Sequence, residues 1–190
     1  MKKAAALVLV GAMIFTLFGC GSKQEQTEES KGSQYASALD VLSAVVDAYA
    51  EEDLFAMYGG NQENAVMDAP GKFDISKTEE LDITLGLPED LAPDIDDAAS
   101  MVHMMNANTF TGAVYHLKAG IDKNAFTDAV KSHILERQWI CGQPDTLLIL
   151  DVDGEYVVTA YGEAEIMKTF QANALSALSS ATVIAEVPIG

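Results

Sequence analysis

The stretch AASMVHMMNANTFTGAVYHLK, residues 98–118, places two apolar runs on either side of an Asn-Ala-Asn turn at 106–108. The second run, 109–117, is rich in Thr, Phe, Val and Tyr and alternates in polarity, which predicts a strand. The first run, 98–105, is either its hairpin partner or the end of a helix that begins near Pro93. The turn residues between the two runs favour the hairpin.

After this stretch the sequence indicates a helix, a second hairpin and a last helix. Asp122 is placed to cap the first helix, and Asp153-Gly154 is a strong turn signal for the hairpin. The predicted elements are a helix at 122–139, strands at 146–152 and 155–161, a helix at 163–178 and an extended piece at 182–189. This (β)β-α-β-β-α order predicts an α+β fold, an antiparallel sheet with helices packed on one face.

An N-terminal helix is predicted to precede the core, because apolar residues recur at three- and four-residue steps across 35–57. Residues 61–97 contain three prolines and many acids, and we expect an irregular segment there. It holds two weak strand signals, one at 73–75 and one in the alternation of Leu81, Ile83 and Leu85. The sequence thus predicts one α+β domain over 35–190, with its core at 98–180.

The N-terminal stretch MKKAAALVLVGAMIFTLFGC has the layout of a secretory signal peptide over residues 1–19. Lys2 and Lys3 precede an uncharged apolar run at 4–18, and a small residue follows it. A transmembrane helix would need roughly 18 to 20 apolar residues. This run is shorter, and the Gly-Cys-Gly-Ser sequence at 19–22 ends it.

Leu17-Phe18-Gly19-Cys20 resembles the lipobox of bacterial lipoproteins. The resemblance implies cleavage after Gly19 and a diacylglycerol thioether on Cys20, and two acyl chains hold a protein stably at a membrane. Residues 21–34 contain no apolar side chain, which predicts a flexible tether. We therefore expect a protein held at the extracytoplasmic face of the cell membrane by a lipid anchor on Cys20.

The charge of the chain limits its partners. The full sequence has a formal charge of −18, and loss of residues 1–19 with Lys2 and Lys3 leaves 9 basic and 29 acidic residues. Nucleic acid is a poor partner for such a surface, because phosphate binding needs Lys and Arg. Cationic ligands, metal ions and basic proteins would be attracted, although an acidic surface also serves solubility alone.

Met101, His103 and Met105 form a cluster of soft ligands, with His116 across the predicted hairpin. Residues two apart in a strand share a face, and thioether and imidazole groups suit copper(I). The alternative is structural, because Met commonly fills gaps in a core.

Three further groups have a structural and a functional interpretation. Cys141 is the one thiol left after lipidation of Cys20, and it lacks the Cys-x-x-Cys spacing of a dithiol catalyst, so it is either a reactive thiol or a buried one. The acidic run at 89–97 is either a weak cation site or a solvated loop. The run at 151–155 starts like a calcium loop, but Gly162 stands where the twelfth-position Glu is needed, which favours the hairpin turn.

A lipobox followed by YG…LPEDL…MVHMMNANTFTGAVYHLK and DVDGEYVVTAYG resembles a family of small lipoproteins of clostridial-type Firmicutes over about residues 58–178. That family is a domain of unknown function, sometimes labelled bacteriocin transport accessory protein. The resemblance implies a Gram-positive membrane lipoprotein and carries over no catalytic residue.

The sequence also lacks a phosphate loop, a hydrolase elbow and a zinc-protease motif. It thus predicts a non-catalytic binding or interaction module without a cofactor, whose ligand is a protein or small molecule of the envelope. The alternative is a metal-carrying or redox-active envelope protein that uses the Met-His hairpin or Cys141.

Overall fold

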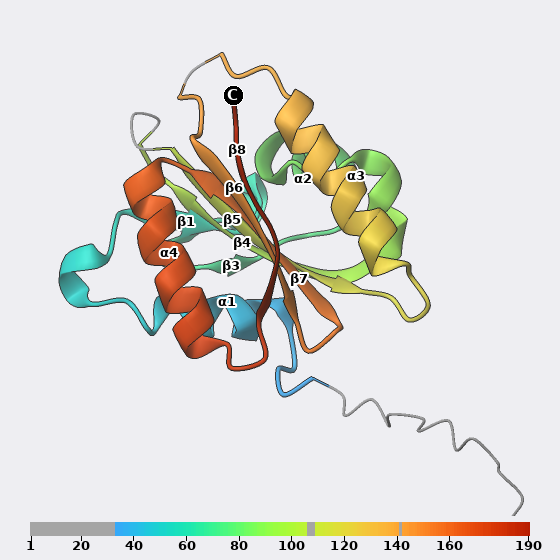
Figure 1. Cartoon of the computed structure of the whole chain (residues 1–190), viewed down its shortest axis with the longest axis horizontal. Coiled ribbons are helices and arrows are strands. Elements are labelled where there is room, and N and C mark those ends of the chain that lie inside the picture. Colours follow the sequence, from blue (N-terminus) through green and yellow to red (C-terminus); the bar gives the residue numbers. More distant parts are fainter. Residues whose placement is uncertain (1–32, 106–108, 141) are drawn as a thin grey trace, which may run out of the picture. The chain divides into compact units, whose positions relative to one another are not determined.

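The computed structural model describes residues 33–105, 109–140 and 142–190, which build one antiparallel sheet of eight strands with helices around it (Figure 1). The strand order is β2-β1-β4-β5-β7-β6-β8, and β3 also pairs with β4. The strands are β1 (Met57–Gly59), β2 (Val66–Met67), β3 (Gly71–Lys72), β4 (Ile95–His103), β5 (Phe110–Leu117), β6 (Thr146–Val152), β7 (Tyr156–Gly162) and β8 (Thr182–Pro188).

The helices flank this sheet in two pairs. The α-helices are α1 (Ala38–Val46), α2 (Thr78–Leu85), α3 (Lys123–Glu136) and α4 (Ala164–Ala177), and the short 3₁₀ helices are η1 (Glu51–Asp53), η2 (Gln62–Asn64) and η3 (Glu89–Asp94). No helix among the described residues is long and apolar enough to cross a membrane. The described residues, from 33 onward, form one compact unit.

The α+β class, the antiparallel sheet and the (β)β-α-β-β-α order are confirmed. Of residues 98–105, those up to His103 belong to strand β4, which pairs with β5 from Ile95↔Leu117 to Val102↔Thr111, so the hairpin alternative holds and the helix alternative does not. The turn at 106–108 lies outside the described residues. The second hairpin turns where predicted, with Asp153 at φ 56° and Gly154 at φ 78°, and Asp122 caps α3 by accepting hydrogen bonds from two backbone N–H groups.

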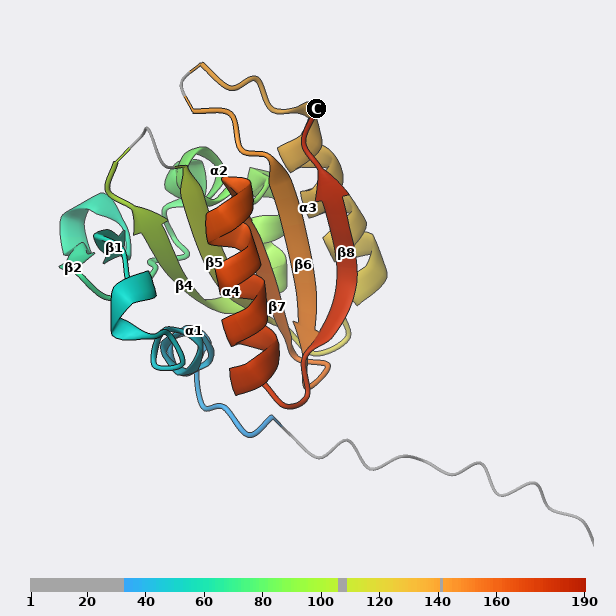
Figure 2. The same ribbon diagram turned by 60° about the vertical axis from the view of Figure 1, so that its left-hand side comes forward.

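The prediction that the helices cover one face of the sheet is wrong. Figure 2 shows α1 and α4 on the near face and α3 behind the strands. One core lies between the sheet and α1 and α4, and a second lies between the sheet and α2 and α3. The central strands explain this arrangement. Every residue of β7 is buried, and β6 is an apolar run. Side chains of a strand point alternately to the two faces of the sheet, so helices must cover both faces.

The segment predicted to be irregular, 61–97, contains α2, and the strand predicted at 81–85 is wrong. Leu81 and Leu85 are fully buried, whereas Ile83 is 61% exposed. The same three apolar residues fit a helix that buries one face, because residues four apart lie one above the other. Gly86 ends α2 in the left-handed conformation at φ 70°.

The predicted N-terminal helix is shorter than 35–57. It ends at Val46, and Met57 already belongs to β1. The other weak strand signal, at 73–75, lies just past β3, although the N–H of Phe73 still donates to the carbonyl of Ala98. The core also extends beyond 98–180, because β4 begins at Ile95 and β8 pairs with β6.

Candidate functional site

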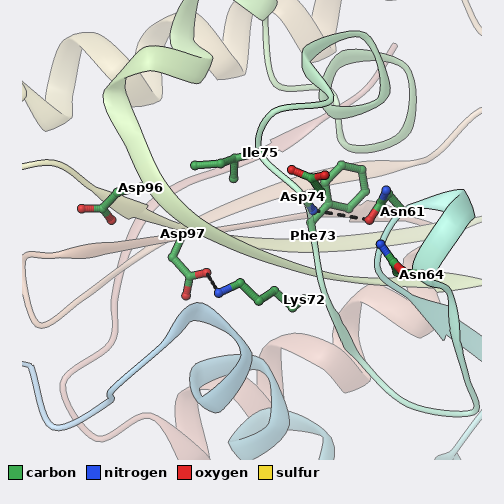
Figure 3. Close-up of a pocket in the computed structure, with 8 residues that line it drawn as sticks. All are labelled: Asn61, Asn64, Lys72, Phe73, Asp74, Ile75, Asp96 and Asp97. Atoms are coloured by element: carbon green, nitrogen blue, oxygen red, sulfur yellow. Dashed lines mark hydrogen bonds and ion pairs between the residues drawn. The ribbon is translucent and has the colours of Figure 1, made fainter.

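Two adjoining hollows lie where β4 begins, and we call them together the Asp96 groove. The first has a volume of about 520 Å³ and the second about 430 Å³, and both are lined by Lys72, Asp96 and Asp97. The first hollow is also lined by Asn61, Asn64, Phe73, Asp74 and Ile75 (Figure 3). The second is also lined by Tyr35, Ala36, Ser37, His116, Glu155 and Tyr156.

A β-bulge in β4 directs Asp96 into the groove. Ile95 pairs with Leu117 and Asp97 pairs with His116, so Asp96 is an extra residue with no partner on β5. A bulge of this kind redirects a side chain, and the Asp96 carboxylate contacts Nδ1 of His116. On the other side of the ring, Nε2 of His116 lies 3.9 Å from Oε2 of Glu155. The imidazole thus stands between two carboxylates.

Asn61 reaches the groove because the chain before it is fixed to β4. The N–H of Gly60 donates to the buried hydroxyl of Ser100 at 2.9 Å, and Gly60 has φ 82°. Gly59 and Gly71 also touch closely, since a Cβ on Gly59 would lie 1.9 Å from the nitrogen of Gly71. This contact joins the segment that carries Asn61 to the segment that carries residues 72–75.

Asp97 lines both hollows, and two contacts hold its carboxylate in place. Its Oδ2 accepts a hydrogen bond from the N–H of Ala38 at 2.9 Å, in the first turn of α1. Its Oδ1 is closed off from solvent and lies 3.2 Å from Nζ of Lys72, an ion pair without hydrogen-bond geometry. Figure 3 shows this ion pair between Lys72 and Asp97. Asp97 therefore contributes to structure as well as to charge.

Asp74 lines only the first hollow, and Glu155 lines only the second. The hydroxyl and N–H of Ser76 donate to Asp74, which lowers the pKa of that carboxyl. Glu155 accepts a hydrogen bond from the N–H of Ser33 at 3.2 Å. Tyr156, next to Glu155, donates its hydroxyl hydrogen to the carbonyl of Tyr35. Residues 33–37 are thereby held along the wall of the second hollow.

The groove as a whole is acidic. Four carboxylates line it, those of Asp74, Asp96, Asp97 and Glu155, against one lysine, Lys72. Leaving His116 aside, this is an excess of three negative charges, on a lining that includes buried and exposed side chains. An acidic hollow of this kind raises the local concentration of cations.

The structure does not gather the four predicted copper ligands. Met101 is fully buried in the core under α1 and α4, whereas Met105 is 59% exposed. Along β5, His116 is five residues from Thr111, which is opposite Val102. That separation puts His116 roughly 17 Å along the sheet from the His103 end. His116 lines the Asp96 groove instead, where its neighbours are carboxylates.

His103 lies in a separate hollow of about 280 Å³ whose lining includes Tyr49, Phe55 and Glu165. Its ring stacks on Phe55, with centroids 4.8 Å apart and planes 9° apart. Its Nδ1 accepts the N–H of Met105 at 3.0 Å. Burial lowers the pKa of His103, so the fold favours the neutral ring.

Cys20 and Cys141 lie outside the described residues. Of the acidic run predicted as a weak cation site, only Asp96 and Asp97 reach the groove, because Glu89, Asp90 and Asp94 belong to η3. Sequence reasoning missed Asn61, Lys72 and Asp74. They stand in the segment that we expected to be irregular, and no spacing in the sequence marks them.

Nowhere in residues 33–105, 109–140 and 142–190 do three His, Cys, Asp or Glu side chains gather so as to hold a metal ion. No protein-family model, curated protein or solved structure matches this chain. The case for a function therefore depends on the groove itself.

Proposed function

We propose that this protein is a lipid-anchored, extracytoplasmic binding module, and that it captures a small organic cation in the Asp96 groove. The observation that carries the proposal is the charge of the lining, four carboxylates against Lys72. Amino groups are the natural complement, since hydrogen bonds between charged partners are stronger than neutral ones. The hollows of about 520 and 430 Å³ fall in the size range of sites for small molecules.

The position of the groove along the chain fits an anchored module. Its wall includes Tyr35, Ala36 and Ser37, which directly follow the predicted lipidated Cys20 and tether at 20–34. A tether of fourteen residues spans at most about 50 Å. The anchor would thus keep the groove close to the membrane surface, where it would meet small solutes of the envelope.

Isothermal titration calorimetry of the full-length chain in detergent micelles, with 1,5-diaminopentane as the probe, tests this proposal. We expect saturable binding that weakens as salt is added. Asp96→Asn and Glu155→Gln should each weaken binding about tenfold, the scale of one charged hydrogen bond.

Glu136→Gln is the matched control, because it removes the same charge from an exposed position at the end of α3. Its affinity should equal that of the wild type. Absence of binding, or an equal loss in the Glu136 variant, would contradict the proposal, because the effect would then come from overall charge and not from the groove.

A further inference from the structure

His103 ends β4 in the hollow of about 280 Å³, which we call the His103 hollow. The residue is 9% exposed, so more than nine-tenths of it is buried. Nδ1 of its ring accepts the N–H of Met105 at 3.0 Å, and burial lowers the pKa of the ring. The fold thus favours the neutral ring, and because Nδ1 is the acceptor, the proton of that neutral ring is on Nε2.

The N–H at Nε2 is a donor without an acceptor. In the part of the chain that the structure describes, Nε2 has no hydrogen-bond partner. Some unpaired side-chain atoms there are closed off from solvent, as Nδ2 of Asn61 is, but Nε2 of His103 is not one of them. Since His103 lines the hollow, a bound molecule can reach this atom. Donors in buried side chains are nearly always paired, so this N–H is suited to an acceptor atom of a ligand.

Two further aromatic rings form the wall beside His103. The ring of Phe55 stacks on that of His103, with the planes 9° apart. Tyr49 meets Phe55 edge-on, with centroids 6.3 Å apart. Aromatic walls of this kind pack well against a flat apolar ring. The volume of about 280 Å³ is just below the usual range for drug-sized ligands, which suits a ligand of one ring with a short chain.

The rim of the His103 hollow is acidic. Glu52 and Asp53 of η1 and Glu165 in the first turn of α4 line it, and all three residues are exposed. No lysine or arginine of the described chain lines the hollow. The lining therefore changes from buried and aromatic at Tyr49 and His103 to exposed and negatively charged at the rim.

We infer that the His103 hollow binds an arylalkylamine, a ligand with one aromatic ring, an oxygen acceptor on that ring and an ammonium group on a short chain. The ring would lie against Phe55 and Tyr49, and its oxygen would accept from Nε2 of His103. The ammonium group would face the rim carboxylates. This site is separate from the Asp96 groove, because the two have no lining residue in common.

Other ligand classes fit this lining less well. An alkyl diamine would meet the rim carboxylates but would leave the aromatic wall without a ring and Nε2 of His103 without an acceptor. An aromatic carboxylate would supply the ring and the acceptor, but its charge would be repelled by Glu52, Asp53 and Glu165. An arylalkylamine with a ring oxygen complements the donor, the wall and the rim together.

Three probes separate these features. Tyramine has all of them, 2-phenylethylamine lacks the ring oxygen, and 4-ethylphenol lacks the amino group. Each is titrated calorimetrically into the full-length chain in detergent micelles, and the heat of titration into micelles alone is subtracted. We expect tyramine to bind about 3- to 10-fold more tightly than 2-phenylethylamine, the scale of one net hydrogen bond. It should bind about tenfold more tightly than 4-ethylphenol, because only an ammonium group is attracted by the carboxylates.

Two variants test the donor and the rim. His103→Phe keeps a ring beside Phe55 and removes the donor, so the preference for tyramine over 2-phenylethylamine should disappear. Glu165→Gln should weaken tyramine binding about two- to fivefold, the range of an exposed ion pair. Glu136→Gln removes the same charge from an exposed position on α3 and should leave the affinity for tyramine unchanged.

The ring nitrogens of the three histidines report where tyramine binds, even if the His103 variant does not fold. In long-range ¹H–¹⁵N spectra of the wild type, the Nε2 signal of His103 should shift with tyramine and much less with 2-phenylethylamine. His133, on α3, is the internal reference and should stay in place. His116 lines the Asp96 groove, so its signal reports the binding of a cation there.

The outcomes distinguish the two proposals. Equal affinities for tyramine and 2-phenylethylamine, or tyramine binding that leaves the His103 signal unchanged, would overturn this inference. A tyramine-induced shift confined to His116 would also overturn it and would support cation capture in the Asp96 groove. A shift of the His103 signal together with the preference for tyramine supports the inference, whether or not the Asp96 groove binds a cation.

Discussion

Gly59 and Gly71 lie so close together that a Cβ atom on Gly59 would meet the backbone nitrogen of Gly71 at 1.9 Å. The same Cβ would lie 2.4 Å from the carbonyl carbon of Pro70 and 2.6 Å from the carbonyl oxygen of Ser100. All three neighbours are backbone atoms, so no side-chain rotation relieves the clash. This contact brings β1 and β3 together beside β4, and with them the two segments that form the first hollow.

Gly59→Ala should therefore lower the free energy of unfolding by at least about 3 kcal/mol, the upper range for overpacking, and should weaken ligand binding. Urea titration followed by circular dichroism measures the change. Gly154→Ala is the control: its Cβ would meet nothing within 4 Å, although φ 78° still costs about 1–2 kcal/mol. Equal losses in the two variants would show that the close approach of Gly59 and Gly71 is unimportant.

Phe170 tests the core under α1 and α4. It is fully buried, and its ring centroid lies 5.2 Å from that of Phe110. Phe170→Ala should cost about 3–5 kcal/mol because it leaves a cavity. Leu175→Ala on the same helix removes a side chain that is 42% exposed and should cost less than about 1 kcal/mol. Denaturant unfolding of both variants checks this, and a small loss for Phe170→Ala would mean that α4 packs loosely.

The burial of His103 predicts that the stability of the protein depends on pH. Burial lowers its pKa in the fold, and the nearby Glu163 opposes that shift only in part. The unfolded chain therefore binds the proton more readily than the folded chain. The stabilisation from a neutral His103 is present above its unfolded pKa of about 6.5 and is lost as the pH falls below that value.

The His103→Gln variant has no titrating side chain at this position. Its free energy of unfolding should therefore change less than that of the wild type when the pH falls from about one unit above 6.5 to about one unit below it. Free energies of unfolding at these two values, measured for both proteins, test the prediction. Parallel changes in the wild type and the variant would refute it.

The proposed lipid anchor predicts a simple labelling result. Cys20→Ser removes the thiol that the diacylglycerol thioether requires, so the expressed chain should no longer take up labelled fatty acid. Cys141→Ser, the matched change at the other cysteine, should leave uptake intact. Labelling of the Cys20 variant at the wild-type level would show that the lipobox assignment is wrong.

Sequence patterns alone were enough to predict the elements of the C-terminal half. The strand of residues 109–117, the Asp153-Gly154 turn and the helix capped by Asp122 all follow from local alternation, turn residues and capping, and the structure has each of them. These signals act between residues that are near in the chain. For the same reason the alternation of Leu81, Ile83 and Leu85 was misleading, because three residues fit both a strand and one turn of a helix.

The site depended on contacts that no local pattern encodes. The Asp96 groove combines Asn61, Lys72, Asp96, His116 and Glu155 from five separate segments. The pairing of β1, β3 and β5 with β4, the pairing of β7 with β5, and the bulge at Asp96 bring them together. The overall acidity could be read from composition, but where that charge gathers depends on strand register, a tertiary property.

The sequence by itself determined the acidity of the chain and the α+β order of the elements, and it is the basis for the proposed lipid anchor at Cys20, because each depends on composition or on neighbouring residues. The tertiary structure alone decided that helices cover both faces of the sheet, that His103 and His116 lie apart, and that the carboxylates of Asp74, Asp96, Asp97 and Glu155 line one groove. The physical reason is that burial and hydrogen-bond pairing depend on contacts between residues distant in the chain. These contacts form only when the sheet packs between its two cores.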